Sequence, residues 1–206
     1  MYEKKPMKIE NKSMDIIDTV MGDVNFSEDE LLVVKRMIHT TGDFEYRKII
    51  EFQNNFIKIA KEAFKNGVSL YTDTKMAYQG INKPALEKSN STVRFFIDDE
   101  DVREKAKEKE TTRSACAIEK AVDKGIEGFV IGNAPTALFR LLELVQEGKA
   151  NPKFIIGVPV GFVGAAESKE LLRTFDIPGI STIGTKGGSN VAASIVNALL
   201  YMVVDR

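Results

Sequence analysis

The stretch FIIGVPVGFVGAAESK, residues 154–169, carries the pattern on which the interpretation of the fold rests. It begins with a nearly continuous apolar run, residues 154–158, of the kind found in strands that are buried on both faces. A turn containing Gly157, Gly161 and Gly164 follows, and a helical pattern is predicted over 167–175. The order of strand, glycine-rich turn and helix indicates one unit of a parallel α/β sheet.

The same alternation extends along the chain in both directions from this unit. Further strand-like runs occupy residues 68–72, 93–97, 128–131 and 180–183, and helical patterns lie over 54–66, 100–109, 113–124, 135–147 and 189–203. Ser27 and Glu30 form a capping-box signature that predicts a helix to about Thr40, with Gly42 as its stop. We therefore predict a single α/β domain over residues 1–206, a doubly wound, mainly parallel sheet of about five strands flanked by helices, with an N-terminal helical extension.

The composition excludes several classes of protein. The 206 residues are 43% apolar and 29% charged, with a formal net charge of −1. This is typical of a globular protein and provides no field that would gather a polyanion. No basic stripe with interleaved aromatic residues is present, which disfavours nucleic-acid binding. No apolar run approaches the roughly 20 residues needed to cross a bilayer, and the N-terminus lacks an apolar signal-peptide core. We expect a cytoplasmic protein without a membrane partner.

Metal and thiol chemistry are not favoured either. The chain has one cysteine, Cys116, and one histidine. An internal disulfide is therefore impossible, and no Cys/His cluster exists that could hold zinc, so we expect no metal site in the protein. Cys116 lies in a helical pattern between two alanines, and we interpret it as a small buried thiol rather than a catalytic nucleophile.

Three glycine-rich turns, residues 131–136, 157–166 and 184–190, each lie between a predicted strand and a predicted helix. In a parallel sheet such turns share the carboxyl edge, where ligands bind, and helix N-termini there suit carboxylates or phosphates. The glycines could instead serve only to form tight turns, although three such turns on one edge favour a ligand-binding edge. Neither the dinucleotide fingerprint nor the P-loop pattern is matched, so a nucleotide site has no support.

His39 is predicted near the end of the capped helix, with Arg36 three residues earlier on the same helical face. The negative end of the helix dipole favours the protonated imidazole and the neighbouring arginine opposes it, a combination that suits a general acid near neutral pH. Taken alone, this segment favours a solvent-exposed or capping histidine over a catalytic one.

Several segments together resemble the precorrin-8X/cobalt-precorrin-8 methylmutase family of corrinoid biosynthesis. The most specific is GVPVGFVGAAESK at 157–169; the others are VKRMIH at 34–39, TRSA at 112–115, GNAPTALF at 132–139 and KGGS at 186–189. The resemblance spans nearly the whole chain. It implies a doubly wound fold and an isomerase that moves the C-11 methyl group of a tetrapyrrole to C-12, giving cobyrinate or hydrogenobyrinate. It also implies homodimers with the substrate near the subunit interface. It implies no cofactor and no S-adenosylmethionine, because the methyl group is already on the substrate.

The resemblance further implies roles for single residues. His39 falls on the catalytic proton donor and acceptor, and Ser13 and Arg36 fall on substrate-contacting positions. Further substrate contacts around the macrocycle are expected at Arg113, Asn133, Gly161, Lys186, Gly187, Gly188 and Ser189. Thr185 departs from the family pattern, in which an arginine often precedes the Lys-Gly-Gly-Ser segment.

Two questions remain open at the level of sequence. The natural substrate could contain cobalt or be metal-free, and any cobalt would belong to the substrate. The alternative function is a non-catalytic corrinoid carrier, because ring-binding turns suit both functions. Arg36 and His39 on one helical face favour the enzyme.

Overall fold

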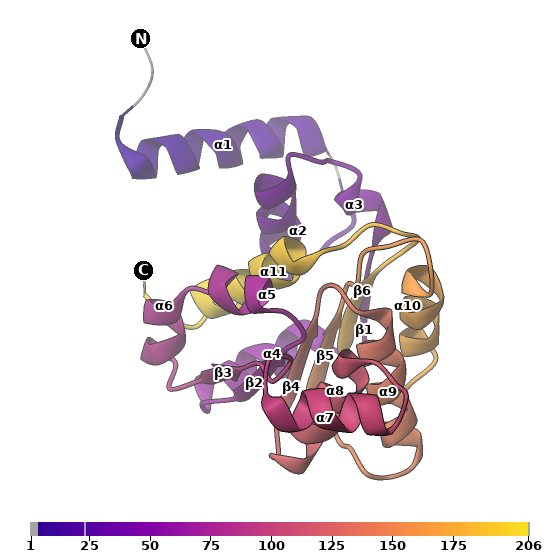
Figure 1. The fold of residues 1–206 in the computed structure, drawn as a ribbon. Helices are drawn as coiled ribbons and strands as arrows, with labels where there is room; N and C mark the ends of the chain where they lie inside the picture. Colours follow the sequence, from indigo (N-terminus) through magenta and orange to yellow (C-terminus); the bar gives the residue numbers. More distant parts are fainter. Residues whose placement is uncertain (1–3, 23, 206) are drawn as a thin grey trace.

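The computed structural model describes residues 4–22 and 24–205, and its centre is a six-stranded sheet in the order β1-β6-β5-β4-β2-β3 (Figure 1). The strands are β1 (Ile50–Gln53), β2 (Ser69–Thr72), β3 (Thr92–Arg94), β4 (Gly128–Ile131), β5 (Phe154–Gly157) and β6 (Gly179–Thr182). Five strands run parallel, whereas β1 pairs antiparallel with β6 at the edge. The predicted fold class is confirmed. The prediction of about five strands missed β1, because its four residues IEFQ are too few and too polar to resemble a buried strand.

Helices cover both faces of the sheet, as expected for a doubly wound fold (Figure 1). One layer comprises α1 (Pro6–Met21), α2 (Glu28–Thr41), α3 (Tyr46–Ile49), α4 (Phe56–Lys65), α5 (Lys75–Gly80), α6 (Lys83–Lys88) and α11 (Ser189–Tyr201). The other comprises α7 (Glu100–Glu108), α8 (Arg113–Asp123), α9 (Pro135–Gln146) and α10 (Ala165–Arg173). Successive residues of β5 face opposite layers: Phe154 and Ile156 belong to one apolar cluster and Ile155 to the other. This alternation explains why the central strands are apolar throughout.

The predicted boundaries of the helix that carries His39 are confirmed. Ser27 and Glu30 form the complete capping box at the start of α2, with Glu30 Oε2 accepting the backbone N–H of Ser27 at 2.9 Å. At the other end Gly42 adopts a left-handed conformation with φ of 67°, and its N–H donates to the carbonyl of Ile38. The position of His39 in the last turn of α2 is therefore set by local sequence at both ends of the helix.

The strand order reverses direction between β2 and β4, because β3 is added on one side of β2 and β4 on the other. Asp73, the residue after β2, lies at this switch point with only 2% of its surface exposed. Its carboxylate accepts the backbone N–H groups of Gly132, Asn133 and Ala134 at 2.9, 2.8 and 2.7 Å. The carboxylate thus caps α9, whose own N-cap residue Ala134 provides no side-chain cap. Burial raises the pKa of Asp73 above its usual range, and the three N–H groups oppose that rise.

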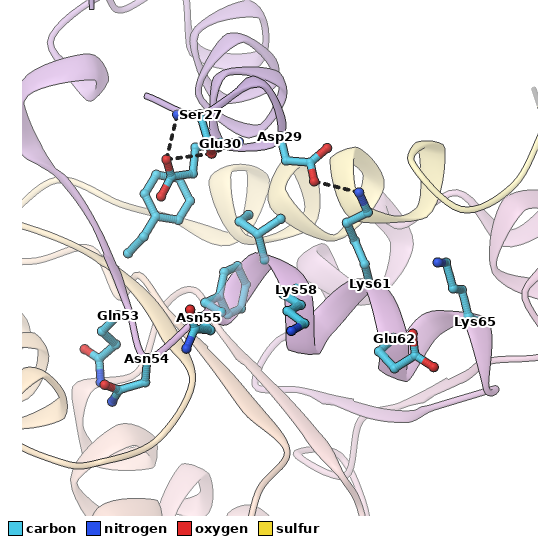
Figure 2. Close-up of a pocket in the computed structure, with 13 residues that line it drawn as sticks. Ser27, Asp29, Glu30, Gln53, Asn54, Asn55, Lys58, Lys61, Glu62 and Lys65 are labelled. Carbon is cyan, nitrogen blue, oxygen red and sulfur yellow. Dashed lines mark hydrogen bonds and ion pairs between the residues drawn. The ribbon is translucent and has the colours of Figure 1, made fainter. Parts of the chain in front are cut away.

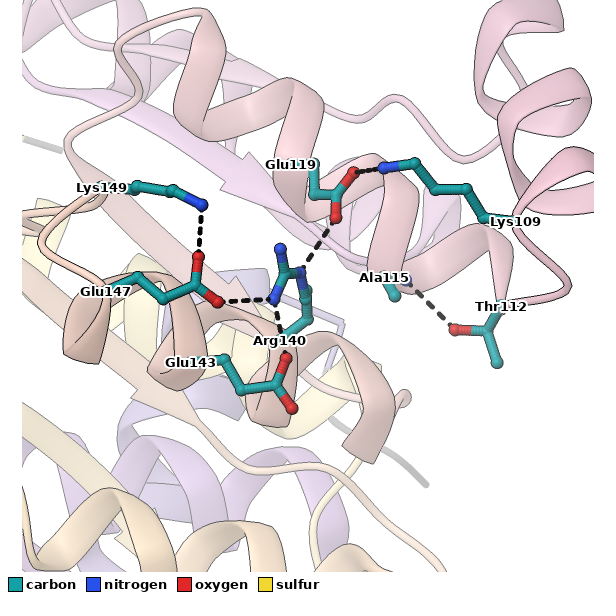
Figure 3. Close-up of polar contacts among 8 residues, drawn as sticks. All are labelled: Lys109, Thr112, Ala115, Glu119, Arg140, Glu143, Glu147 and Lys149. Atoms are coloured by element: carbon teal, nitrogen blue, oxygen red, sulfur yellow. Dashed lines mark hydrogen bonds and ion pairs between the residues drawn. The ribbon is translucent and has the colours of Figure 1, made fainter.

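Ion pairs hold together the outer surface of α8 and α9 (Figure 3). Arg140 of α9 contacts Glu119 of α8 at 2.9 Å, and Glu143 and Glu147 of its own helix at 2.8 and 3.2 Å. Lysines also pair with two of these glutamates. Neighbouring carboxylates neutralise the positive charges on this surface, so it offers little to an anionic ligand.

Replacing Asp73 with alanine tests its role at the switch point. The Asp73→Ala variant leaves three backbone N–H groups without their acceptor, and we expect the free energy of unfolding to fall by about 3 kcal/mol. Denaturant titration of the purified protein measures this change. Asp98→Ala is the matched control: that carboxylate pairs with the exposed Arg103 at 3.7 Å, and its loss should cost no more than about 0.5 kcal/mol. Equal stability of the two variants would contradict the capping role.

Candidate active site

The turns after β5 and β6 form one unit at the carboxyl edge of the sheet. The N–H of Gly161 donates to the carbonyl of Thr185 at 3.1 Å, and the N–H of Gly188 donates to the carbonyl of Val158 at 2.9 Å. The turn after β4 joins them through Gly132, where an added Cβ would lie 2.8 Å from the Cα of Ser189. The three predicted glycine turns are therefore in contact with one another.

The glycines of this edge serve two different purposes. A Cβ on Gly187 would overlap the carbonyl oxygen of Val158, so Gly187, like Gly132, is required for the close packing of backbones. Gly161 has φ of 150°, and a Cβ there would meet only the side chain of Ala165, at 3.8 Å. The turn around Gly161 is therefore open on its outer side. The next two side chains, Phe162 and Val163, are 92% and 89% exposed.

The carboxyl-terminal end of α2 is bound to the third turn. The ammonium of Lys186 pairs with the carboxylates of Asp43 and Glu45, the latter at 2.6 Å. The hydroxyl of Tyr46 donates to the carbonyl of Gly187 at 3.4 Å. Lys186 lowers the pKa of Asp43, and the two carboxylates raise the pKa of Lys186 well above its usual range. The segment that follows α2 is thereby tied to the third turn, and His39 is exposed on the last turn of that helix.

Ser13 and Arg36 lie in the same layer, where α1, α2 and α11 meet. Arg36 pairs with Glu10 of α1 at 2.9 Å, and its guanidinium carbon lies 5.2 Å from the ring centre of Tyr201 on α11. Arg36 lines a recess of about 330 Å³ between these helices. The hydroxyl of Ser13 donates to the carbonyl of Ile9 within α1. Unlike Arg36, four residues of α2 are fully buried: Val33, Val34, Met37 and Ile38.

Arg113 and Asn133 form a third group at the switch point. Both line a recess of about 420 Å³ together with Asp73 and Thr74. Arg113 and Asn133 are exposed, while the backbone N–H of Asn133 is already engaged by Asp73. Ser189, buried at the start of α11, shares a hydrogen bond of 2.8 Å with the hydroxyl of Thr74. The predicted site residues thus fall into three groups, around Arg36, around Lys186 and around Arg113, rather than into one closed pocket.

A larger recess of about 560 Å³ lies at the opposite edge of the sheet (Figure 2). The start of α2, the end of β1 and the helix α4 line it, and Lys61 and Asp29 form an ion pair there at 2.6 Å. Because β1 is antiparallel to β6, the end of β1 lies at the amino edge of the parallel strands. This recess contains none of the predicted site residues.

Two sets of polar residues at the carboxyl edge were not predicted from the sequence. Asp73 directly follows the buried strand β2. From that position an acidic residue can cap α9, the helix that follows the adjacent strand β4, so its place in the sequence was the available signal. Asp43 and Glu45 are partners of Lys186 from far away in the sequence, and no local pattern indicates such a pairing. Cys116 is buried as predicted, and burial raises the pKa of its thiol, which disfavours the nucleophilic thiolate.

Two further findings concern the described part of the chain as a whole. Within residues 4–22 and 24–205, no three His, Cys, Asp or Glu side chains gather as a metal site would require. In the same part of the chain, no helix combines the length and the apolar character needed to span a membrane.

Comparisons with known proteins agree with one another. The family model for precorrin-8X methylmutase matches residues 8–202. The cobalt-precorrin-8 methylmutase of Priestia megaterium is 40% identical, covering 95% of this chain and 87% of that protein. The protein of the same name from Salmonella typhimurium is 42% identical over 97% of both. The crystal structure of precorrin-8x methyl mutase from Thermus thermophilus matches with a TM-score of 0.89 at 34% identity, covering 96% of each chain. The sequence comparisons and the fold comparison agree, and the chain belongs to the precorrin-8X methylmutase family.

Proposed function

We propose that this protein is the isomerase that moves a methyl group from C-11 to C-12 of cobalt-precorrin-8 or precorrin-8X in cobalamin biosynthesis. The observation that carries the proposal is the family match over residues 8–202, which includes the His39 helix and all three glycine turns. The named relatives are methylmutases, so a non-catalytic carrier is not favoured. The transferred methyl group is part of the substrate, and the proposed reaction therefore needs no S-adenosylmethionine and no other cofactor.

In this proposal His39 protonates the conjugated macrocycle, at a pyrrole-type nitrogen. Protonation makes the ring electron-poor and eases a 1,5-sigmatropic methyl shift, after which the proton returns to the imidazole. The exposure of His39 supports this role, as does the ion pair of Lys186 with Glu45, which ties the segment after the His39 helix to the third glycine turn. Among side chains, imidazole is the one most often used to give and recover a proton in catalysis.

The remaining site residues would hold the carboxylated rim of the ring. Arg36 suits a peripheral carboxylate, which would replace the carboxylate of Glu10 that Arg36 now contacts. Ser13 on the neighbouring helix would orient the ligand or the imidazole. Lys186 would act mainly through its backbone, because two carboxylates already engage its ammonium. The further contacts would come from Arg113, Asn133, Gly161, Gly187, Gly188 and Ser189.

We infer that the natural substrate is the cobalt form rather than the metal-free form. Both of the named bacterial relatives described above are cobalt-precorrin-8 methylmutases. The cobalt is part of the substrate in this assignment. An assay with cobalt-loaded and metal-free precursor in parallel tests it, and faster turnover of the metal-free precursor would contradict it.

The role of His39 is tested by replacement with alanine. We expect kcat of His39→Ala to fall by about 10²–10⁴-fold, because a well-placed general acid contributes about that factor. The absorption change of the precursor, followed over time, measures turnover. Thr40→Ala, at the neighbouring exposed position of α2, is the matched control and should keep the wild-type rate. A rate near that of the wild type in His39→Ala would exclude the proton-transfer role.

We further propose that the protein acts as a homodimer with the substrate near the interface. Two features of one chain support this arrangement. First, the predicted site residues form separate groups rather than a closed pocket. Second, two of the elements that carry predicted site residues also carry exposed apolar side chains. These are Phe162 and Val163 on the second turn, and Ile9 and Ile16 on α1. Apolar surface of this kind is typical of an interface.

Light scattering coupled to size-exclusion chromatography tests the homodimer. We expect a mass twice the 22.9 kDa of one chain. Phe162→Asp places a charge on the exposed loop, and we expect it to shift the equilibrium towards the single chain if that loop is buried between subunits. A mass of one chain for the wild type at every concentration would contradict the homodimer.

A further inference from the structure

Lys169 is a buried cation at the carboxyl edge that the proposed reaction does not use. It lies on α10 with none of its surface exposed. Its ammonium donates to the hydroxyl of Thr182 at 3.1 Å and to the backbone carbonyl of Lys186 at 2.8 Å. Among residues 4–22 and 24–205 it has no carboxylate partner, and the charged group that acts on it is another cation, Arg173.

Stability of the fold does not explain a lysine at this position. Burial disfavours the charged form of Lys169 and, with a smaller contribution from Arg173, lowers its pKa to about 8. The carbonyl of Lys186 has a second donor, the hydroxyl of Thr182 at 2.6 Å, and would stay satisfied without the lysine. An apolar side chain of similar length would remove a desolvated charge and leave no buried donor without an acceptor.

The contacts of Lys186 indicate what the buried ammonium does instead. Lys169 donates both to the backbone carbonyl of Lys186 and to the hydroxyl of Thr182, which donates to the same carbonyl. On the outside, Asp43 and Glu45 hold the ammonium of Lys186. Those two carboxylates follow Gly42, the residue at which the His39 helix ends. A continuous series of contacts therefore leads from the interior of α10, through one residue of the third turn, to the end of α2.

We propose that Lys169 is a positioning residue for the reaction: through Lys186 it fixes the end of α2, and with it the place of His39 on the last turn of that helix. The proposal rests on the proposed proton-transfer role of His39. The buried ammonium destabilises the fold, and in return it provides a rigid connection between α10 and the end of α2. A displacement of about 1 Å at a reacting group can reduce a rate by about 100-fold, so such a connection has a measurable effect on kcat.

The single histidine of the chain allows a direct test by nuclear magnetic resonance. In protein labelled on histidine alone, the imidazole of His39 gives the only signals. We expect Lys169→Met to shift these signals while melting no lower than the wild type. Lys61→Met is the matched control, since Lys61 also pairs with a carboxylate of α2, Asp29, but at the opposite end of the helix (Figure 2). It should leave the signals of His39 in place.

Kinetics provides the second measurement. We expect kcat of Lys169→Met to fall by about 10-fold with KM within about 3-fold of the wild type, because the displaced group acts in the chemical step. Lys186→Met should have a similar effect, and the double variant should be no slower than the slower single variant, because both changes interrupt one connection. Multiplied effects in the double variant would overturn the proposal.

The outcomes separate this proposal from the one on which it rests. Unchanged His39 signals in Lys169→Met overturn the positioning role, whatever His39 does in catalysis. Shifted signals together with a wild-type rate in His39→Ala leave the connection intact and remove the proton-transfer role. Should Lys169→Met fail to fold, Lys186→Met interrupts the same connection at a partly exposed side chain. Unchanged His39 signals in Lys186→Met would then overturn the positioning role in the same way.

Discussion

The close approach of three backbone turns at one edge of the sheet is the constraint on which the rest of the structure depends. The turns after β4, β5 and β6 touch main chain to main chain, and side chains at Gly132 or Gly187 would prevent this. Once the turns are joined, α11 starts next to the switch point and the third turn faces the end of α2. The glycines of this edge therefore act first as packing residues. The turn around Gly161, by contrast, is open enough for a ligand to approach the backbone.

The central part of the fold could be predicted from sequence because its signals are local. Buried strands with apolar residues on both faces, and helices with caps such as that of Ser27, carry their structure in adjacent residues. The antiparallel strand β1 and the short helices α5 and α6 were not predicted, because runs of four to six residues carry too little periodicity. Their conformations are decided by the neighbours they pack against.

The candidate site was predictable to a smaller extent, and mostly through resemblance. The residue pattern alone indicated a ligand-binding edge and favoured an exposed or capping role for His39 over a catalytic one, since an exposed histidine at a helix end has no distinguishing local signature. The contacts that give the edge its shape join residues far apart in the chain, such as Asp73 with Gly132 and Lys186 with Glu45. Pairings of this kind follow from the strand order, which periodicity does not reveal. The structure also shows that Arg36 and Lys186, both candidate contacts for carboxylates, already have carboxylate partners.

The carboxylate of Asp73 has a consequence for small molecules that could inhibit the protein. In doubly wound proteins the switch point at the carboxyl edge is where an anionic group of a ligand commonly meets the N-terminus of a helix. Here the chain fills that position with a side chain of its own, which takes the three N–H groups that would otherwise receive the ligand. Compounds designed to resemble nucleotides would find this position occupied. Selective inhibitors would instead have to exploit the groups that stay accessible, such as the open turn at Gly161, the exposed imidazole of His39 and the recess beside Arg36.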